Sequence, residues 1–306
     1  MSVLIAITQR DNSKLIAKLK AELPNMRIEE WPHCQDLNNI EFVLAWNAPS
    51  SMWEKLPNLK VVSSFGAGID SIDLSLLPEC VDVVRIIDKQ LAEDMAEYVL
   101  THVLAQKLRL KEYFIKQTHQ IWQPKRAYRY NKVAILGYGQ LGKACATKLI
   151  NNGFSVSAWS QTQKHSDNVS LYYDKQGLDK MLNNTDYLVC LLPLTDATKG
   201  IINKTLLAKL PAHSTIINVA RGAHVVEQDL LNALNKGDLR SATLDVFAEE
   251  PLANNHPYWQ HSKITLTPHC AALSDLSCVI EQILHNIEYF NKGIALNNRV
   301  DRMKGY

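Results

Sequence analysis

Three short strings of the sequence run from apolar residues into side chains that could protonate and bind a carbonyl compound. One string ends at Arg221, one at Glu250 and one at His269. Histidine has a pKa suited to giving a proton to a carbonyl oxygen that is receiving a hydride. A carboxylate orients such an imidazole and favours its charged form. An arginine binds a substrate carboxylate while polarising the carbonyl, so the set fits hydride transfer to a small 2-keto acid.

Each of these residues also has a structural interpretation. Arg221 could be a surface arginine at a strand end, and His269 a packed core histidine. Glu250 could be a solvated acid before Pro251, and its neighbour Glu249 is equivalent to it by residue type. A thiol–imidazole pair of Cys270 with His269 is disfavoured, because adjacent side chains usually point apart.

The surrounding chain alternates short apolar runs with longer amphipathic stretches. Strands are predicted at Val3–Thr8, Phe42–Trp46 and Leu59–Ser64, and a helix at Asn12–Leu23. Such alternation indicates parallel sheets covered by helices. Ligands of open parallel sheets lie outside the carboxyl ends of the strands, so the three strings are expected to face one crevice.

The pattern restarts after a long helical stretch at Asp88–Gln120 and a polar loop at Gln123–Arg126. We therefore predict an α/β protein with two Rossmann-like, doubly wound parallel-sheet domains and an active site in the cleft between them. A last helix at Asp275–Phe290 has one apolar side and should lead the chain back to the first domain. The predicted substrate domain comprises residues 1–99 and 285–306, and the predicted dinucleotide-binding domain comprises residues 100–284.

The second series opens with a strand, a glycine-rich turn and a helix. Gly137, Gly139 and Gly142 form the spacing GxGxxG. Gly137 is expected to permit a tight turn, and Gly139 to let the backbone approach a pyrophosphate. Gly142 is expected to let the helix pack closely on the strand. The N–H groups of Gln140 and Leu141 at the helix start would face the anion. In this strand–turn–helix setting, the motif predicts a dinucleotide site rather than a turn without a ligand.

The end of the next strand bears on the choice of nicotinamide cofactor. A site for NAD usually has a carboxylate here that hydrogen-bonds the ribose 2′-hydroxyl. This chain has Ser160, Gln161 and Lys164 instead, which favours NADPH, with NADH as the alternative. Gln161 and Gln163 are neutral, and Lys164 has a second interpretation as a solvated loop charge.

The bulk composition excludes several other classes of protein. The chain has 306 residues, 46% hydrophobic and 21% charged, with a formal net charge of +2, so nothing suggests a nucleic-acid partner. No apolar run approaches the ~20 residues of a membrane span. The start of the sequence lacks the basic region of a signal peptide. The six cysteines are scattered without a CxxC pair, which argues against a metal site and favours reduced thiols in the cytoplasm.

The motifs together resemble the D-isomer-specific 2-hydroxyacid dehydrogenases, in the family's order and over nearly the whole chain. They are the GxGxxG turn and three strings: Asn218–Gly222, Leu244–Phe247 with Glu250–Leu252, and Thr267–His269. The segments Gly222–Glu227, Pro257–His261 and Val300–Tyr306 further resemble the glyoxylate/hydroxypyruvate reductase A branch. That branch uses NADPH to reduce glyoxylate and hydroxypyruvate. At the two positions where that branch has arginines beside the ribose, this chain has Gln161 and Gln163.

The resemblance also implies roles for individual residues. Arg221 would bind substrate, and His269 with Glu250 would act as the acid and base. Asp245 would lie near the nicotinamide carboxamide. The remaining implied contacts are Leu192, Pro193 and Ala220 with the cofactor, and Trp46, Gly66, Ala67 and Gly68 with the substrate. A homodimer is implied as well.

Three other functions remain open at this point. A formate-dehydrogenase-like enzyme would carry glutamine where this chain has Glu250. A D-lactate-type dehydrogenase would share the chemistry but prefer another 2-keto acid. An NAD(H)-sensing corepressor would share the fold without needing the intact set of Arg221, Glu250 and His269.

Overall fold

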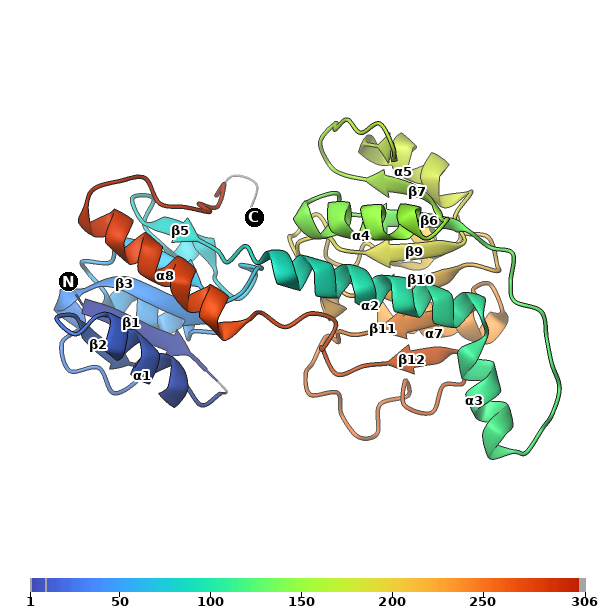
Figure 1. Cartoon of the computed structure of the whole chain (residues 1–306), viewed down its shortest axis with the longest axis horizontal. Coiled ribbons are helices and arrows are strands. Elements are labelled where there is room, and N and C mark those ends of the chain that lie inside the picture. Colours follow the sequence, from blue (N-terminus) through green and yellow to red (C-terminus); the bar gives the residue numbers. More distant parts are fainter. Residues whose placement is uncertain (1, 9, 303–306) are drawn as a thin grey trace. The chain divides into compact units, whose positions relative to one another are not determined.

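The computed structural model describes residues 2–8 and 10–302, and the chain divides into two compact units. Unit 1 comprises Met1–Gln90 and Ser274–Tyr306, and unit 2 comprises Leu91–Leu273. Each unit is a parallel sheet with helices on both faces (Figure 1). The predicted α/β class with two doubly wound domains is confirmed.

Unit 1 contains a five-stranded sheet in the order β2-β1-β3-β4-β5. Its strands are β1 (Ser2–Ile7), β2 (Arg27–Glu30), β3 (Ile40–Trp46), β4 (Val61–Ser64) and β5 (Asp82–Val84). All of the pairings between these strands are parallel. The carboxyl ends of β3, β4 and β5 therefore lie along one edge of the sheet.

Helices α1 (Ser13–Glu22) and α8 (Leu276–Asn291) cover one face of this sheet. Leu15 and Leu19 of α1 and Val279 and Ile283 of α8 are buried in the same apolar cluster, which fixes the two helices against the strands. The other face carries short 3-10 turns, η1 (Leu37–Asn39), η2 (Ser50–Lys55) and η3 (Leu74–Leu76). These turns and helices position the loops that follow the strands.

Unit 2 contains a seven-stranded parallel sheet in the order β12-β11-β10-β9-β6-β7-β8. The strands are β6 (Lys132–Leu136), β7 (Ser155–Trp159), β8 (Ser170–Tyr172), β9 (Tyr187–Cys190), β10 (Thr215–Asn218), β11 (Ser241–Leu244) and β12 (Ile264–Leu266). The strand order reverses between β6 and β9, which is where ligands bind in folds of this type.

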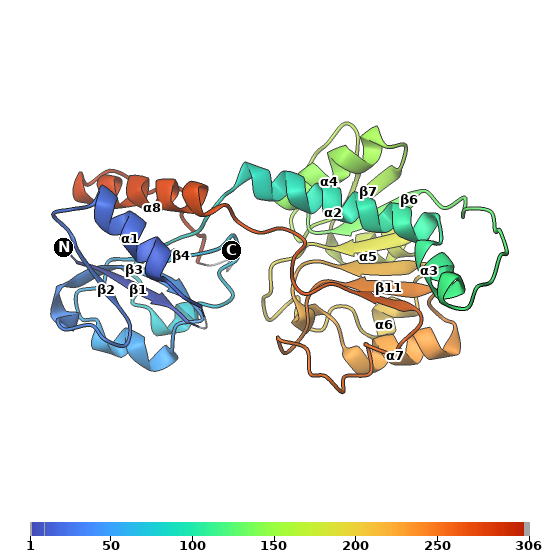
Figure 2. The same ribbon diagram turned by 60° about the horizontal axis from the view of Figure 1, so that its bottom comes forward.

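Two helical layers enclose the sheet of unit 2 (Figure 2). One contains α2 (Lys89–Lys107) and α4 (Gln140–Asn151), and the other contains α6 (Lys204–Leu207) and α7 (Glu227–Lys236). Helices α3 (Leu110–Thr118) and α5 (Asp174–Leu182) and the turn η4 (Gly222–His224) complete the unit. Separate apolar clusters fill the two faces, so the strands are buried on both sides, as their continuous apolar runs indicate.

Two predicted features need correction. The single helix expected at Asp88–Gln120 is interrupted, because Arg109 adopts the left-handed conformation with φ of 62° between α2 and α3. The domain boundaries fall at 90/91 and 273/274, earlier than the predicted 99/100 and 284/285. Met95 and Ala96 of α2 are already buried in unit 2, and Val279 and Ile280 of α8 are buried in unit 1.

The predicted tail motif Val300–Tyr306 lies only partly within the described residues, since 303–306 fall outside them. Arg302 donates to four backbone carbonyls, those of Leu74, Leu77, Pro78 and Val81. These bonds fasten the end of the described chain to unit 1. No helix within residues 2–8 and 10–302 is long and apolar enough to cross a membrane.

Candidate active site

The predicted site residues of unit 2 follow neighbouring strands at one edge of the sheet. Gly137 follows β6, Leu192 lies two residues beyond β9, Arg221 three beyond β10, and Asp245 directly after β11. His269 lies three residues beyond β12. Because the strands are parallel and adjacent, their carboxyl ends share an edge, and the structure brings the predicted residues of this unit together there.

His269 and Glu250 form a direct hydrogen-bonded pair. Nδ1 of His269 lies 2.7 Å from Oε2 of Glu250, while Oε1 of Glu250 accepts from the backbone N–H of Phe247 at 2.8 Å. The structure thus distinguishes Glu250 from Glu249, which residue type alone could not do. No other described residue is bonded to the His269 ring, and its side chain is 43% exposed, so Nε2 is open to a ligand.

The pair shifts the pKa of both members toward their charged forms. The hydrogen bond from Glu250, reinforced by its charge and by Asp245, raises the pKa of His269 despite opposing effects of burial and Arg221. Burial alone would raise the pKa of Glu250, but the bonds from His269 and Phe247 outweigh it and the pKa is lowered. The arrangement favours an imidazolium beside a carboxylate, which is a proton donor held in one orientation.

Arg221 is positioned by a short turn and a buried histidine. Its backbone N–H donates to Nδ1 of His224 at 3.2 Å, and its carbonyl accepts from the Asn218 side chain at 2.9 Å. His224 is fully buried and its Nε2 lies 3.3 Å from the Pro193 carbonyl. Asn218 and His224 lie within the family motifs, but the motifs gave neither residue a role. They hold the backbone at Arg221 and link it to the segment after β9.

Gly222 brings the arginine string against the acidic string. A Cβ atom at Gly222 would lie 1.9 Å from the backbone carbonyl carbon of Phe247, so a side chain there would collide with the backbone. Only glycine allows the two strings to approach this closely. The close approach explains why the charge of Arg221 influences the pKa of both Glu250 and His269.

The turn that carries His269 is held by the buried side chain of Asp245. One carboxylate oxygen of Asp245 accepts from the N–H of Cys270 and the other from that of Ala271, both at 2.9 Å. The Asp245 carbonyl accepts from the N–H of His269 at 2.7 Å. His269 has φ of 51°, an uncommon conformation for a residue other than glycine, and these bonds maintain it.

Two residues that sequence analysis missed extend this network. The Thr267 hydroxyl donates its hydrogen to the Asp245 carboxylate at 2.5 Å. Its oxygen lies 2.5 Å from the Tyr98 hydroxyl, and because the Thr267 hydrogen is already used, Tyr98 is the donor in that bond. Tyr98 lies on α2, so the helix is tied directly to the histidine turn. Burial raises the pKa of Tyr98, which keeps the phenol protonated and able to donate. No sequence signal marks this contact, because its partners lie 169 residues apart.

The phosphate loop, residues Gly137–Gly142, has the geometry expected of its glycines. Gly137 has φ of 101°. A Cβ atom at Gly142 would lie 2.0 Å from the Gly137 carbonyl oxygen, whereas one at Gly139 would meet no atom within 4 Å. Helix α4 begins at Gln140, so the first N–H groups of the helix have no helical acceptor. The open space at Gly139 and these free donors fit a pyrophosphate group.

The ribose-side residues follow β7. Ser160 is buried and its hydroxyl donates to the Thr162 carbonyl, while Gln161 is exposed. The Lys164 ammonium donates to the carbonyl of Tyr138 in the phosphate loop at 2.8 Å. Burial and nearby Lys143 lower the pKa of Lys164. Lys164 is therefore anchored at the loop, and the two cations make this place favourable for an anion.

The predicted cofactor contacts after β9 and β10 are held by hydrogen bonds from side chains to backbone carbonyls. Leu192 is buried, and the Pro193 carbonyl accepts from the Thr198 hydroxyl at 2.7 Å. The Ala220 carbonyl accepts from Nη1 of Arg221 at 2.7 Å. These contacts order the segments that flank the phosphate loop.

The predicted substrate residues lie in unit 1, at the carboxyl ends of β3 and β4. A Cβ atom at Gly66 would lie 2.6 Å from the Trp46 ring, so the indole packs directly on the substrate loop, residues Ser64–Gly68. The Ser64 hydroxyl donates to the Gly68 carbonyl at 2.6 Å and accepts from the Gly66 N–H at 3.2 Å. The loop is therefore a closed turn with Trp46 on one side.

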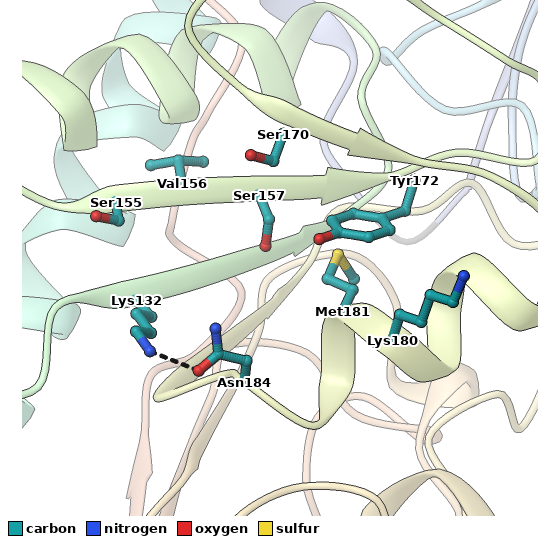
Figure 3. Close-up of a pocket in the computed structure, with 9 residues that line it drawn as sticks. All are labelled: Lys132, Ser155, Val156, Ser157, Ser170, Tyr172, Lys180, Met181 and Asn184. Atoms are coloured by element: carbon teal, nitrogen blue, oxygen red, sulfur yellow. Dashed lines mark hydrogen bonds between the residues drawn. The ribbon is translucent and has the colours of Figure 1, made fainter.

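A pocket of unit 2 lies elsewhere on the same sheet. It has a volume of about 190 Å³ and is lined by residues of β6, β7, β8 and α5 and by Asn184, which follows α5 (Figure 3). None of its lining residues belongs to the predicted set, and Lys132 there donates to Asn184. Among the residues described, no group of three His, Cys, Asp or Glu side chains could hold a metal ion.

Comparison with known proteins gives one consistent result. The model of the family "D-isomer specific 2-hydroxyacid dehydrogenase, NAD binding domain" matches residues 100–271. Glyoxylate/hydroxypyruvate reductase A of Yersinia enterocolitica is 38% identical over 299 residues, 95% of each chain. The protein of the same name from Klebsiella pneumoniae subsp. pneumoniae is 37% identical over 304 residues, 97% of each chain.

Solved structures similar to this chain come from the same family. A D-isomer-specific 2-hydroxyacid dehydrogenase of Xanthobacter autotrophicus Py2, in complex with NADPH and MES, has a TM-score of 0.91 at 32% identity. An NADPH-dependent glyoxylate/hydroxypyruvate reductase of Sinorhizobium meliloti, in complex with NADP and sulfate, has a TM-score of 0.90 at 33% identity. Each comparison covers 100% of this chain and 99% of the other.

Proposed function

We propose that this chain, which belongs to the D-isomer-specific 2-hydroxyacid dehydrogenase family, reduces glyoxylate and hydroxypyruvate to glycolate and D-glycerate with NADPH. The observation that carries the proposal is the His269–Glu250 pair beside Arg221, at the sheet edge that also carries the phosphate loop. The relatives named above support this choice of substrates and cofactor.

The phosphate loop and Lys164 would hold the cofactor. The N–H groups at the start of α4 are suited to the pyrophosphate, and the open space at Gly139 lets the backbone approach it. Lys164 and Lys143 favour the extra phosphate of NADPH over the bare ribose of NADH. When bound, the nicotinamide supplies the hydride that reduces C2 of the substrate.

His269 provides the proton for the carbonyl oxygen. Nδ1 is directed at Glu250, so Nε2 would face the substrate, and the raised pKa of His269 favours the protonated ring. Arg221 binds the substrate carboxylate and stabilises negative charge as it develops on the oxygen. The substrate loop and Trp46 of unit 1 would supply further contacts to the substrate.

A substrate panel tests the proposed function. Purified protein is assayed for oxidation of NADPH and NADH with glyoxylate, hydroxypyruvate and pyruvate. Fast turnover of the first two acids with NADPH is expected. Preference for pyruvate would indicate a D-lactate-type enzyme, and tight NADPH binding without turnover of any acid would indicate a sensor.

We also propose that the protein is a homodimer. Six large apolar side chains with exposures of 37–98% gather within residues 108–122: Leu108, Leu110, Phe114, Ile115, Ile121 and Trp122. Burying such a patch against a second copy removes apolar surface from water. Light scattering should give twice the 34.6 kDa chain mass, and Phe114→Glu with Trp122→Glu should give the single-chain mass.

A cytoplasmic location completes the proposal. All six cysteines are free thiols, which suits a reducing compartment. Cell fractionation should place the protein with cytoplasmic markers, and recovery in an extracytoplasmic fraction would contradict this.

A further inference from the structure

The substrate loop of unit 1 has a cation beside it that no motif marks. Arg85 directly follows β5, the edge strand next to β4, and its Nη1 donates to the Ala67 carbonyl at 3.3 Å. The backbone also fixes this segment, because the Ile86 N–H donates to the Gly66 carbonyl at 3.1 Å. The guanidinium is therefore held at the loop.

The hydrogen bonds of Arg85 are incomplete. A guanidinium has five N–H donors. Among the described residues, the Arg85 guanidinium forms one hydrogen bond, to the Ala67 carbonyl. No carboxylate of the described chain forms an ion pair with it, although burial is sufficient to lower its pKa. Arg302 of the same unit instead donates to four carbonyls. Arg85 is a half-buried cation with unused donors that are not sealed from solvent.

The backbone of the loop shows the same pattern. The carbonyls of Gly66, Ala67 and Gly68 all accept hydrogen bonds from the chain. The N–H groups of Ala67 and Gly68 have no acceptor within the described residues. Acceptors are therefore satisfied and donors are left open, which is the polarity of a site for an anion.

From this juxtaposition we propose that Arg85 binds the substrate carboxylate together with the N–H groups of Ala67 and Gly68. This inference rests on the proposed function, because it takes the anion to be the carboxylate of a 2-keto acid. A planar guanidinium and two adjacent N–H groups match the oxygens of a carboxylate. Arg85 is thus a specificity-determining cation of unit 1.

Three variants separate binding of the carboxylate from support of the loop. Arg85→Gln retains a donor for the Ala67 carbonyl but removes the charge, and Arg85→Lys retains the charge. Arg10→Gln is the matched control, because the Arg10 guanidinium lies 4.7 Å from the Phe65 ring on the same loop but is exposed. The assays are KM and kcat for glyoxylate and for its methyl ester, the Kd for NADPH, and Tm.

We expect Arg85→Gln to raise KM for glyoxylate about ten- to a hundredfold, the range for loss of a charged hydrogen bond, with little change in kcat. The methyl ester should be affected far less, so discrimination between acid and ester should fall. Arg85→Lys should recover much of the affinity, and Arg10→Gln should match the wild type. NADPH binding and Tm should be unchanged in all three.

The proposal is overturned if Arg85→Gln keeps the wild-type KM, or if acid and ester are weakened equally. Equal impairment of Arg85→Lys and Arg85→Gln with a lowered Tm would assign Arg85 to loop structure and also overturn it. These results leave wild-type turnover intact and thus spare the proposed function. Absence of wild-type turnover with any 2-keto acid would remove both.

Discussion

Nδ1 of His269 lies 2.7 Å from Oε2 of Glu250, and this pair determines the pH dependence expected of the reaction. The pair raises the pKa of His269 and lowers that of Glu250. Reduction consumes the protonated imidazole. As pH rises, the rate should therefore stay constant until the pH reaches the raised pKa of His269, and should fall above it. Well below that pKa the imidazole is almost fully protonated.

Glu250→Gln should therefore move the basic limb of the kcat/KM profile for glyoxylate reduction to lower pH. The substitution removes the charge that stabilises the imidazolium, while burial and Arg221 still lower the pKa of His269. Glu249→Gln is the matched control, since it removes the same charge one residue away without touching His269. Identical pH profiles for the two variants would contradict the assigned pairing.

Arg221→Ala should lower kcat/KM for glyoxylate by roughly 10²–10³-fold, the usual loss when a charge-stabilising donor is removed. Both substrate binding and turnover should suffer, because the guanidinium contacts the ground state and the transition state. Arg299→Ala, which breaks an exposed ion pair with Asp82, serves as the control. A wild-type kcat/KM in Arg221→Ala would remove the arginine from the mechanism.

The phosphate loop should respond differently at two of its glycines. Gly139→Ala should leave Tm nearly unchanged, because the new Cβ meets open space, but should weaken NADPH binding by blocking backbone approach. Gly142→Ala should lower Tm by several degrees, because its Cβ would lie 2.0 Å from the Gly137 carbonyl oxygen. Thermal unfolding and NADPH titration measure both effects. Unchanged NADPH affinity in Gly139→Ala would place the pyrophosphate elsewhere.

Cofactor preference should depend on the residues after β7. Lys164→Gln should weaken NADPH relative to NADH, because it removes the cation anchored at the phosphate loop. Gln161→Arg should have the opposite effect through a new charged contact with the 2′-phosphate. The ratio of kcat/KM with the two cofactors is the measurement. A constant ratio across both variants would mean that this strand end does not reach the ribose.

The network under the histidine turn should be required for catalysis as well as for stability. Thr267→Val leaves the Tyr98 hydroxyl without its hydrogen-bond partner and removes one of the three hydrogen bonds that the Asp245 carboxylate accepts. The expected cost is about 1–3 kcal/mol in the free energy of unfolding. The kcat should fall with little change in the Kd for NADPH, because the turn holds His269 in place. Tyr98→Phe should have a smaller effect of the same kind. Normal kcat in both variants, despite lower stability, would restrict the network to folding.

The sequence was sufficient to locate the residues of unit 2, because each stands at the end of an apolar strand and parallel strands end at one edge. Residue type could not choose between Glu249 and Glu250, since both have the same chemistry and the choice depends on the path of the backbone. Only the family resemblance favoured Glu250. Arg85 was missed because its strand is short and no distinctive string surrounds it. Tyr98 and Thr267 were missed because tertiary packing alone brings them together.

The boundaries were less predictable for a related reason. The sequence pattern of residues 88–120 is continuous, and the left-handed conformation of Arg109 between α2 and α3 has no glycine or proline to signal it. The division between units depends on which core buries Met95 and Val279, and periodicity does not reveal this.

The most direct test of the central claim compares wild type and His269→Ala for NADPH oxidation with glyoxylate, alongside NADPH binding by fluorescence. The account predicts rapid turnover by the wild type, a fall in kcat of about 10²–10⁴-fold in the variant, and equal affinity for NADPH in the two proteins. Undiminished turnover in His269→Ala would contradict it.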